Sequence, residues 1–517
     1  MPAGRCSVRD VSTAPTMIWP LRRAMLIAAE RPAVAFEGVE LTYAEVWDRC
    51  RRLAGGLRAV GVERGDRVAV VAQNSHRYLE LYQAVPGAGM VLVPLNHRHA
   101  DPELRYALAD SRARVLFTDR DISDLPDCVE RVVDAADGHD ALLAGAEPAG
   151  FGDDVGEDDL AGLFYTGGTT GAAKGVMLPH RSLVANAMHV QAVWPFDAET
   201  RFLLVAPMFH LAGTLAVLAT VWHGARQVVM RAFDPAGLLD LVERERITAT
   251  QVVPSMLAAI SEEQLARPRD VSSLRFLTFG GAPSATETLR RAHRAFPDAE
   301  LMTMYGATET APLVTAVRHV ERRLDTPEAR TCGQPLVGVE ARIVDPDNRT
   351  PVARGEVGEV AVRGPNVMLG YWDKPDQTAA ALADGWYHTG DLGRLDDAGY
   401  LYLVDRAKDM IVSGGENVYS TEVEDVLYRH PAVLEAAVFG VPDARWGEAV
   451  HAVVVPRSEV TEDDLIAHCR GSIGGYKVPK RIEIRDEPLP KSGAGKLLKR
   501  ELRAPYWEGR ESMVSGA

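Results

Sequence analysis

Residues 67–119 read RVAVVAQNSHRYLELYQAVPGAGMVLVPLNHRHADPELRYALADSRARVLFTD, and this stretch decides the fold class of the chain. It contains three short apolar runs, which are typical of buried strands, at 67–72, 91–96 and 114–119. Patterns around Tyr78–Val85 and from Pro102 onwards predict a helix in each interval between these runs. Strands that alternate with helices in this way predict a mostly parallel sheet covered on both faces.

The alternation extends to both sides of this stretch. Before it, Thr42 and Glu45 have the spacing of a capping box, so a helix is predicted to begin there. Its apolar side chains fall on one face: Val46, Cys50, Leu53 and Leu57. Later in the chain, apolar runs at 202–207, 226–231 and 248–254 alternate with helical patterns at 211–222 and 238–246. The sequence therefore predicts two α/β lobes.

The last third of the chain has a different pattern. From about Thr331, short β-like runs are broken by glycine, which favours an antiparallel sheet or a small barrel. After a predicted linker at 405–409, the order helix, strand, strand, helix, strand predicts a small α+β unit, and the polar tail after Leu502 is expected to fray. We therefore predict an α/β fold, with a large N-terminal domain at 1–404 that contains two lobes and a β-barrel-like subdomain, and a smaller C-terminal domain at 410–517.

Composition restricts the classes of function. The 517 residues include 57 Lys plus Arg and 72 Asp plus Glu, a formal net charge of −15, which disfavours nucleic acid as a partner. The five cysteines have no CxxC spacing, so neither a disulfide framework nor a zinc site is expected. No secretory signal is evident, and the most apolar window, 211–222, is shorter than the roughly 18 residues of a spanning helix. A cytoplasmic protein without a transmembrane segment is expected.

A loop rich in glycine and threonine lies in YTGGTTGAAKGVMLPH, at 165–180. Backbone N–H groups freed by glycine form a nest for anions, hydroxyls donate to oxygen, and a lysine adds a positive charge. The residues of this kind are Thr166, Gly167, Gly168, Thr169, Thr170, Gly171 and Lys174. Because Lys174 follows Ala173 and not glycine, the loop is not a Walker A sequence. It predicts a phosphate-binding loop, with a surface linker as the alternative.

Other known patterns are incomplete. The Gly-Lys pair at 495–496 is followed by Leu497 where a Walker A sequence needs serine or threonine. The glycines at 87 and 89 lack the third glycine of a dinucleotide fingerprint. His97 and His99 do not have the helical spacing of metal ligands and are expected at the surface.

Six further motifs follow in order along the chain: PMFH at 207–210, GGAPS at 280–284, MYGATE at 304–309, YHTGDLG at 387–393, DRAKDMIVSGGENVYSTEVE at 405–424 and PKSGAGKLLKREL at 490–502. With the loop, they resemble the adenylate-forming superfamily of acyl-CoA synthetases, aryl-CoA ligases, luciferases and peptide-synthetase adenylation domains. The loop departs from that family's YTSGTTGxPKGV at Gly167 and Ala173, and the first change removes one hydroxyl. The resemblance covers about residues 30–505.

The resemblance implies a nucleotide site. Tyr305 resembles the residue that stacks on adenine, and Asp391 and Arg406 resemble the partners of the ribose hydroxyls. Glycine and small residues would line the adenine: Gly280, Gly281, Ala282, Pro283 and Gly306. Thr308 would bond the α-phosphate and Glu309 would hold Mg²⁺, with Thr170 as a second candidate ligand. The alternatives are a core tyrosine, a glutamate in a solvated turn, and a structural Asp391–Arg406 ion pair.

The resemblance also implies a catalytic lysine on the C-terminal domain. Lys496 would bridge the substrate carboxylate and the α-phosphate. The alternative is a solvated basic turn, because Lys491, Lys499 and Arg500 are close in sequence.

Transfer to a thiol would use other residues. His210 resembles a gate between the acyl pocket and the pantetheine tunnel, and the alternative is a core histidine. Lys408 falls at the hinge position, so the C-terminal domain is expected to be mobile, and Gly414 and Gly415 would lie beside the tunnel.

The implied activity is that of an AMP-forming acyl-CoA ligase that uses ATP, Mg²⁺ and CoA. The expected partners are a carboxylic acid and CoA, and a homodimer is left open. Medium- or long-chain fatty acids are the first expectation, aryl acids of the cinnamate or benzoate type the second, and small dicarboxylates the third. The alternatives are an enzyme that loads a separate carrier protein and a non-catalytic sensor, which retention of the site residues disfavours.

Overall fold

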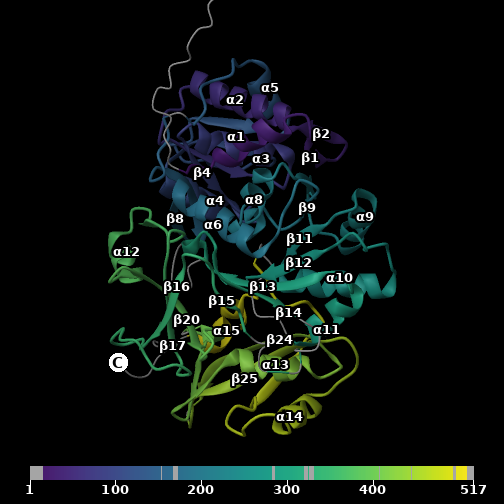
Figure 1. Cartoon of the computed structure of the whole chain (residues 1–517). Coiled ribbons are helices and arrows are strands. Elements are labelled where there is room, and N and C mark those ends of the chain that lie inside the picture. Colours follow the sequence, from purple (N-terminus) through teal and green to yellow (C-terminus); the bar gives the residue numbers. More distant parts are fainter. Residues whose placement is uncertain are drawn as a thin grey trace, which may run out of the picture. The chain divides into compact units, whose positions relative to one another are not determined.

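The computed structural model describes residues 15–152, 154–166, 173–281, 286–319, 324, 326, 331–406, 408–443, 445–492 and 497–508 (Figure 1). The chain forms two compact units, each built from separate stretches. The first unit comprises Met1–Gln251, Gly306–Leu313 and Gly364–Ala380, and the second comprises Val252–Tyr305, Val314–Arg363 and Ala381–Ala517. The boundary predicted at 405–409 divides the chain differently and stays a prediction.

A seven-stranded sheet in the first unit has the order β18-β8-β7-β4-β3-β5-β6. Its strands are β3 (Arg67–Val71), β4 (Val91–Pro94), β5 (Ala113–Thr118), β6 (Arg131–Asp134), β7 (Leu160–Thr166), β8 (Lys174–Pro179) and β18 (Gly370–Tyr371). Strand β3 pairs in parallel with both β4 and β5, which confirms the parallel sheet predicted from residues 67–119. Strands β7 and β8 pair antiparallel and flank the glycine- and threonine-rich loop.

The helices next to this sheet follow the predicted pattern. They are α1 (Trp19–Ala28), α2 (Tyr43–Ala59), α3 (His76–Gly87), α4 (Asp101–Ser111) and α5 (Asp137–Ala144). Helix α2 begins with the predicted capping box, in which the Thr42 hydroxyl accepts from Glu45 N–H and the Glu45 carboxylate accepts from Thr42 N–H. The predicted apolar face of α2 is buried. Helix α2, purple in Figure 1, packs beside the blue helix α5.

The second predicted lobe is also present, with one difference. In the first unit its strands have the order β11-β9-β10-β1-β2: β11 (Ala249–Val252), β9 (Arg201–Leu204), β10 (Arg226–Val229), β1 (Pro32–Phe36) and β2 (Val39–Thr42). In chain order, helix α6 (His180–Val193) precedes β9, and helix α9 (Pro235–Glu245) lies between β10 and β11. The single helix predicted at 211–222 is two short helices, α7 (Leu211–Thr214) and α8 (Val217–Trp222). Gly213 lies in the first of them, and a Cβ there would meet the Pro207 carbonyl oxygen at 2.1 Å, so this segment is held close to the preceding chain.

The second unit contains two kinds of sheet before residue 407. Strand β12 (Phe276–Gly280) pairs in parallel with β13 (Glu300–Gly306), and β14 (Leu313–His319) pairs with β15 (Gln334–Pro335). Helices α10 (Pro254–Ala266) and α11 (Thr286–Ala295) pack together. The predicted antiparallel arrangement after Thr331 is confirmed in a five-stranded sheet of β16 (Glu340–Val344), β17 (Gly358–Arg363), β19 (Leu382–Ala383), β20 (Trp386–Leu395) and β21 (Leu401–Arg406). The short helix α12 (Pro375–Ala381) precedes β19.

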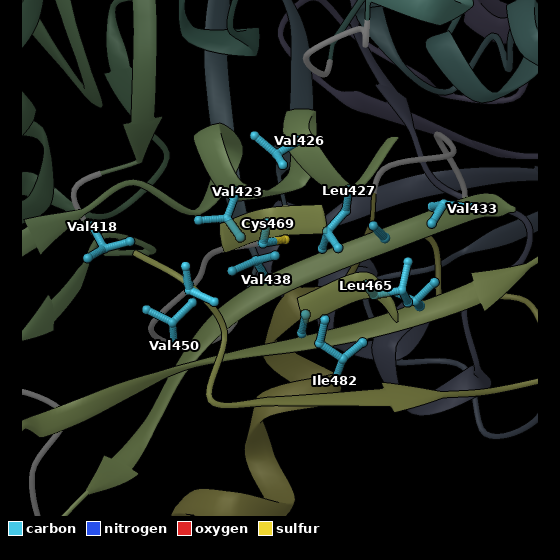
Figure 2. Packing of buried hydrophobic residues seen from close by; sticks show 14 of the residues in the cluster. Val418, Val423, Val426, Leu427, Val433, Val438, Val450, Leu465, Cys469 and Ile482 are labelled. Atoms are coloured by element: carbon cyan, nitrogen blue, oxygen red, sulfur yellow. The ribbon is translucent and has the colours of Figure 1, made fainter. Parts of the chain in front are cut away.

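The C-terminal part consists of β22 (Ile411–Ser413), β23 (Glu416–Val418), α13 (Ser420–Tyr428), β24 (Val433–Asp443), β25 (Gly447–Pro456), α14 (Glu462–Arg470), β26 (Arg481–Ile484) and α15 (Lys499–Trp507). It contains the predicted order of helix, strand, strand, helix and strand from α13 to β26, with two short strands before it and a helix after it that were not predicted. Figure 2 shows apolar side chains of α13, α14 and the sheet packed into one core, with Val423, Leu427 and Val438 among them. The expectation of a frayed tail after Leu502 is wrong as far as Trp507, because the Trp507 indole N–H donates to the Gly440 carbonyl (3.1 Å).

No helix in the described parts of the chain combines the length and apolar character that spanning a membrane requires.

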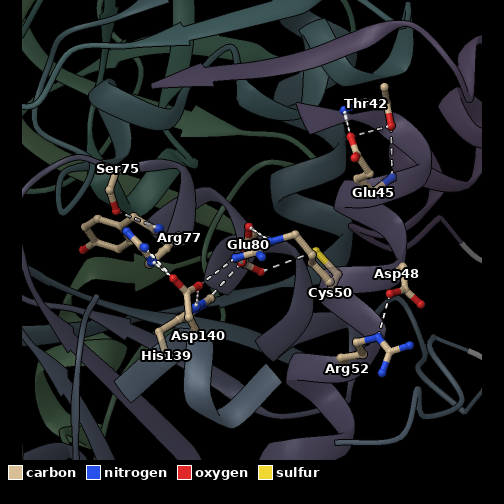
Figure 3. A network of polar contacts seen from close by, with 12 residues as sticks. Thr42, Glu45, Asp48, Cys50, Arg52, Ser75, Arg77, Glu80, His139 and Asp140 are labelled. Atoms are coloured by element: carbon tan, nitrogen blue, oxygen red, sulfur yellow. Dashed lines mark hydrogen bonds and ion pairs between the residues drawn. The ribbon is translucent and has the colours of Figure 1, made fainter. Parts of the chain in front are cut away.

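A buried polar cluster joins α2, α3 and α5 (Figure 3). The Glu80 carboxylate is only 1% exposed and accepts two hydrogen bonds from the Arg49 guanidinium, at 2.6 and 3.2 Å. His139 lies 3.4 Å from Glu80 and 3.6 Å from Asp140. Contact with His139 and with the guanidinium groups of Arg77 and Arg49 holds the pKa of Asp140 well below its usual range.

Removing Glu80 should destabilise the protein strongly. Glu80→Ala leaves the half-buried Arg49 guanidinium without this partner, and breaking a buried ion pair costs about 3–5 kcal/mol. Asp48→Ala is the matched control, because its ion pair with Arg52 (2.6 Å) lies on the exposed face of the same helix and is worth under about 1 kcal/mol. Urea unfolding followed by circular dichroism would measure the difference. Equal midpoints for the two variants would contradict a structural role for the buried cluster.

Candidate active site

The glycine- and threonine-rich loop is described at its two ends. Thr166 ends β7 and Lys174 begins β8, and these two residues are partners in the antiparallel register. The strand pairing therefore holds both ends of the loop together. The predicted residues Gly167, Gly168, Thr169, Thr170 and Gly171 lie outside the described residues.

Lys174 belongs to a small cluster in the first unit. Its ammonium nitrogen lies over the ring of Tyr371, 4.6 Å from the centroid. The Tyr371 hydroxyl donates a hydrogen bond to Glu309 Oε1 (3.0 Å). The sequence analysis did not single out Tyr371, although it follows a glycine in an isolated aromatic pair, Tyr371-Trp372. The structure thus joins a predicted phosphate-binding lysine to a predicted metal-binding carboxylate through one tyrosine.

The segment that carries Thr308 and Glu309 is a single 3₁₀ turn, η1 (Thr308–Thr310). It is anchored from inside, because the buried Asn366 amide donates to the carbonyls of Thr310 (2.9 Å) and Leu313 (2.6 Å). Gly306 is required before it, since a Cβ there would meet the Pro312 carbonyl oxygen at 1.7 Å. Thr308 and Glu309 themselves are half-buried, which disfavours the alternative of a glutamate in a solvated turn.

The chemistry of this first cluster suits Mg²⁺ and phosphate. Hard cations prefer carboxylate and phosphate oxygens. Among the described residues, no hydrogen bond or ion pair engages the second oxygen of Glu309, Oε2. The same part of the chain contains no group of three or more His, Cys, Asp or Glu placed to hold a metal, so phosphate oxygens would have to complete the coordination of an ion held by Glu309.

A second cluster lies in the second unit, around Asp391. The Tyr305 hydroxyl donates to Asp391 Oδ2 (2.9 Å), and Arg406 Nε lies 3.3 Å from Asp391 Oδ1. Asp391 and Arg406 are partners in the register of β20 and β21. Burial, together with the nearby Asp391 carboxylate, raises the pKa of Tyr305 well above its ordinary value. The predicted ribose partners are therefore an ion pair in this structure, and a buried tyrosine adjoins them.

The residues predicted to line the adenine begin where β12 ends. Gly280 is the register partner of Met304 on β13, and a Cβ at Gly280 would meet the Met304 carbonyl oxygen at 2.4 Å. Gly281 has a positive φ of 85°, which favours glycine. Ala282 and Pro283 lie outside the described residues.

His210 stands at the start of α7. Its Nδ1 accepts from the N–H of Ala212 (3.2 Å), so the imidazole caps the helix. The neighbouring Phe209 packs edge-on against the ring of His97, with centroids 5.5 Å apart. His97, which was expected at the surface, is half-buried: its ring packs against Phe209, and burial lowers its pKa.

The catalytic lysine predicted at Lys496 lies outside the described residues, and the described chain resumes at Leu497. Lys499, at the start of α15, forms an ion pair with Glu424 (2.7 Å) and donates to the Ser420 hydroxyl (2.6 Å). Asp405 accepts from the Ser420 N–H and hydroxyl. Burial raises the pKa of Glu424, and the Lys499 ammonium opposes that rise. Lys499 is thus a half-buried residue that is paired with Glu424 and hydrogen-bonded to Ser420.

The predicted hinge and tunnel residues occupy turns of the second unit. Lys408 follows β21, and its carbonyl accepts from the Arg503 guanidinium (3.4 Å). Gly414 and Gly415 join β22 to β23 with positive φ of 64° and 84°. A Cβ at Gly414 would meet the ring of Trp446 at 2.7 Å.

Trp446 is a residue that the sequence analysis missed. The Arg445 guanidinium lies 4.6 Å from the centroid of its ring and the Lys480 ammonium 5.8 Å from it. Trp446 is 38% exposed. The signal in the sequence was an Arg-Trp-Gly triplet at 445–447 between two strand-like runs. An exposed aromatic face flanked by two cations suits a ligand that combines a flat ring with phosphates.

Comparison with known proteins identifies the family. The description "AMP-binding enzyme" matches residues 21–372, and "AMP-binding enzyme C-terminal domain" matches residues 422–496. A protein named feruloyl-CoA synthase, from Amycolatopsis sp., is 43% identical over 500 residues, which cover 94% of this chain and 98% of that protein. The medium/long-chain-fatty-acid–CoA ligase FadD8 of Mycobacterium tuberculosis is 35% identical over 511 residues, which cover 93% and 88%.

A solved structure supports the same family assignment. The crystal structure of ATP-bound MatB from Rhodopseudomonas palustris has a TM-score of 0.86 and 31% identity, covering 96% of this chain and 100% of that one. This likeness confirms the predicted α/β fold class, and the family match extends over both the large and the C-terminal parts of the chain. The chain therefore belongs to the AMP-binding enzyme family, the AMP-forming acid–thiol ligases of the adenylate-forming superfamily.

Proposed function

We propose that the protein is an ATP-dependent carboxylic acid–CoA ligase that forms an acyl adenylate and then an acyl-CoA thioester. The observation that carries this proposal is the cluster of Lys174, Tyr371 and Glu309, which presents a cation and a carboxylate suited to the phosphates and metal of MgATP. The names of the feruloyl-CoA synthase and of FadD8 support CoA as the acceptor.

In the proposed first half-reaction, an oxygen of the substrate carboxylate attacks the α-phosphorus of ATP and pyrophosphate leaves. Lys174 and the loop at 166–174 would hold the leaving pyrophosphate, and Thr308 would bond the α-phosphate. Glu309 would hold Mg²⁺, with Thr170 as a second candidate ligand, and the ion would neutralise phosphate charge. Tyr305 and the glycines from 280 would enclose adenine, while Asp391 would accept the ribose hydroxyls and Arg406 would donate to them. Lys496 would stabilise the charge that develops between the carboxylate and the α-phosphate.

In the proposed second half-reaction, the CoA thiol attacks the acyl carbonyl and AMP leaves. The C-terminal domain, 410–517, would turn about Lys408 and bring Gly414 and Gly415 to the pantetheine, with His210 as the gate. Trp446, beside Gly414, would stack on the adenine of CoA, and Arg445 and Lys480 would contact its phosphates.

For the acid, we propose an aryl-propenoic acid of the cinnamate type. The relative at 43% identity is named for feruloyl-CoA. The family resemblance would place residues 210–214, 280–282 and 304–306 around the acyl group, and because these segments contain no Lys or Arg, small dicarboxylates are disfavoured. A medium- or long-chain fatty acid, the first expectation from the sequence, is the second candidate, supported by the likeness to FadD8.

The central test is pyrophosphate release from MgATP with cinnamic, benzoic, fatty and dicarboxylic acids, with and without CoA. Release that depends on the acid and becomes catalytic with CoA is expected, and it would identify the acid class. If release stops near one equivalent of pyrophosphate per enzyme, with or without CoA, a carrier protein would be indicated as the acceptor. No release with any acid would contradict the ligase proposal.

Lys496→Ala should lower the rate of adenylation by about a hundredfold or more, because it removes a preorganised charge from the transition state. Arg500→Ala is the matched control, since Arg500 is an exposed cation four residues further along the same segment. Acid-dependent exchange of pyrophosphate into ATP measures this half-reaction alone. An equal loss in both variants would argue for a general effect of basic charge.

Trp446→Ala should raise KM for CoA about tenfold, because stacking of a base on an aromatic ring is worth about 1–3 kcal/mol. Exchange of pyrophosphate into ATP should stay unchanged, since CoA takes no part in it. Trp446→Phe, which keeps a ring, should restore most of the affinity. A fall in the exchange rate of the alanine variant would instead indicate a structural role next to Gly414.

A further inference from the structure

Tyr371 uses the two parts of its side chain for two different partners. Its hydroxyl donates to Glu309 Oε1 at 3.0 Å, and its ring face carries the Lys174 ammonium at 4.6 Å from the centroid. Tyr371 is 7% exposed, and its two partners, Lys174 and Glu309, are half-buried. Glu309 lies 62 residues before Tyr371 in the sequence, and Lys174 lies far before either. All three belong to the first unit.

The backbone around Tyr371 is fixed on both sides. Tyr371 N–H donates to the Thr378 hydroxyl (2.9 Å), and Tyr371 is the register partner of Val176 on β8. The next residue, Trp372, donates its backbone N–H to the Gly175 carbonyl (2.8 Å) and its indole N–H to the Asp110 carbonyl (3.0 Å). Strand β8, which contains Lys174, therefore fixes the position of the Tyr371 backbone next to that lysine.

The intervening ring has an electrostatic consequence. Lysine and glutamate side chains that approach each other directly form an ion pair, in which each charge neutralises the other. Among the described residues, Lys174 forms no ion pair with any carboxylate, and only Tyr371 hydrogen-bonds to the Glu309 side chain. The tyrosine satisfies both charges weakly, since a ring face attracts a cation and a phenol donates to a carboxylate. Both charged groups thus keep their capacity for stronger ligands.

We propose that Tyr371 is a positioning residue that keeps Lys174 and Glu309 apart and aims the first at pyrophosphate and the second at the divalent cation. Its hydroxyl occupies Oε1 of Glu309 and leaves Oε2 for the cation, while its ring supports the lysine. This inference rests on the proposed function, because it assigns an ATP-bound cation to Glu309.

Two variants separate the two contacts. Tyr371→Phe removes the hydroxyl and keeps the ring, whereas Tyr371→Leu removes both. Binding of Mn²⁺ in the presence of ATP, followed by electron paramagnetic resonance, reports on Glu309 without turnover. Binding of metal-free inorganic pyrophosphate, followed by calorimetry, reports on Lys174. Tyr43→Phe is the matched control, since this buried tyrosine also loses one hydrogen bond, to the Ala225 carbonyl (2.5 Å).

The Tyr371→Phe variant is expected to affect Mn²⁺ binding and pyrophosphate binding differently. Tyr371→Phe should weaken Mn²⁺ binding about tenfold and leave pyrophosphate binding within twofold, because only the hydrogen bond to the carboxylate is lost. Tyr371→Leu should weaken both, and Tyr43→Phe should weaken neither. Mn²⁺ binding by Tyr371→Phe within twofold of the original protein would overturn the inference, as would equal losses of both probes in the Phe and Leu variants.

Failure of the inference is distinguishable from failure of the proposed function. If the original protein catalyses acid-dependent release of pyrophosphate but Tyr371→Phe binds Mn²⁺ normally, only the role of Tyr371 is overturned. If the original protein binds neither Mn²⁺ with ATP nor pyrophosphate, the proposed ligase and the inference fall together. Thermal unfolding of each variant, compared with Tyr43→Phe, identifies any loss that comes from misfolding.

Discussion

The antiparallel pairing of β7 with β8 is the constraint on which the first cluster depends. Because Thr166 and Lys174 are register partners, the glycine- and threonine-rich loop begins and ends at one place on the sheet. The same strand, β8, also pairs with β18, and this second pairing brings Tyr371 to Lys174. A loop with many glycines has little conformational preference of its own, so the strands on either side must fix where it starts. The phosphate-binding chemistry proposed here is therefore held by sheet hydrogen bonds.

Local signals in the sequence predicted much of the fold. The capping box at Thr42 and the apolar runs at 67–72 and 91–96 each act within a few residues, and the structure contains the helix and strands that they predict. The division of 211–222 into two helices was not predictable in this way, because it accompanies the close approach of Gly213 to Pro207. Helix α15 was missed for a similar reason: its end is held by a hydrogen bond from Trp507 to Gly440, 67 residues earlier.

The candidate site shows the same limit. Glycine at 306 was recognised from its motif, and the structure gives the reason, a backbone contact that no side chain would permit. The short local signals at Tyr371 and Trp446, an aromatic pair and an Arg-Trp-Gly triplet, do not predict a role; that comes from what the fold places beside them, Glu309 in one case and Gly414 in the other. Lys499 appeared from composition to belong to a solvated basic run, yet its partner Glu424 lies on another helix. Long-range partners of this kind are invisible in a single sequence.

The first unit is assembled from three separate stretches of chain, and its cluster takes one residue from each: Lys174 from Met1–Gln251, Glu309 from Gly306–Leu313 and Tyr371 from Gly364–Ala380. A gene fragment that ends at residue 251 would therefore encode the lysine without its aromatic support or the carboxylate. Splitting the protein for fragment complementation, or permuting its termini, would have to return all three stretches to one folded body. The chain is thus poorly suited to being cut into autonomous halves at the end of its first long stretch.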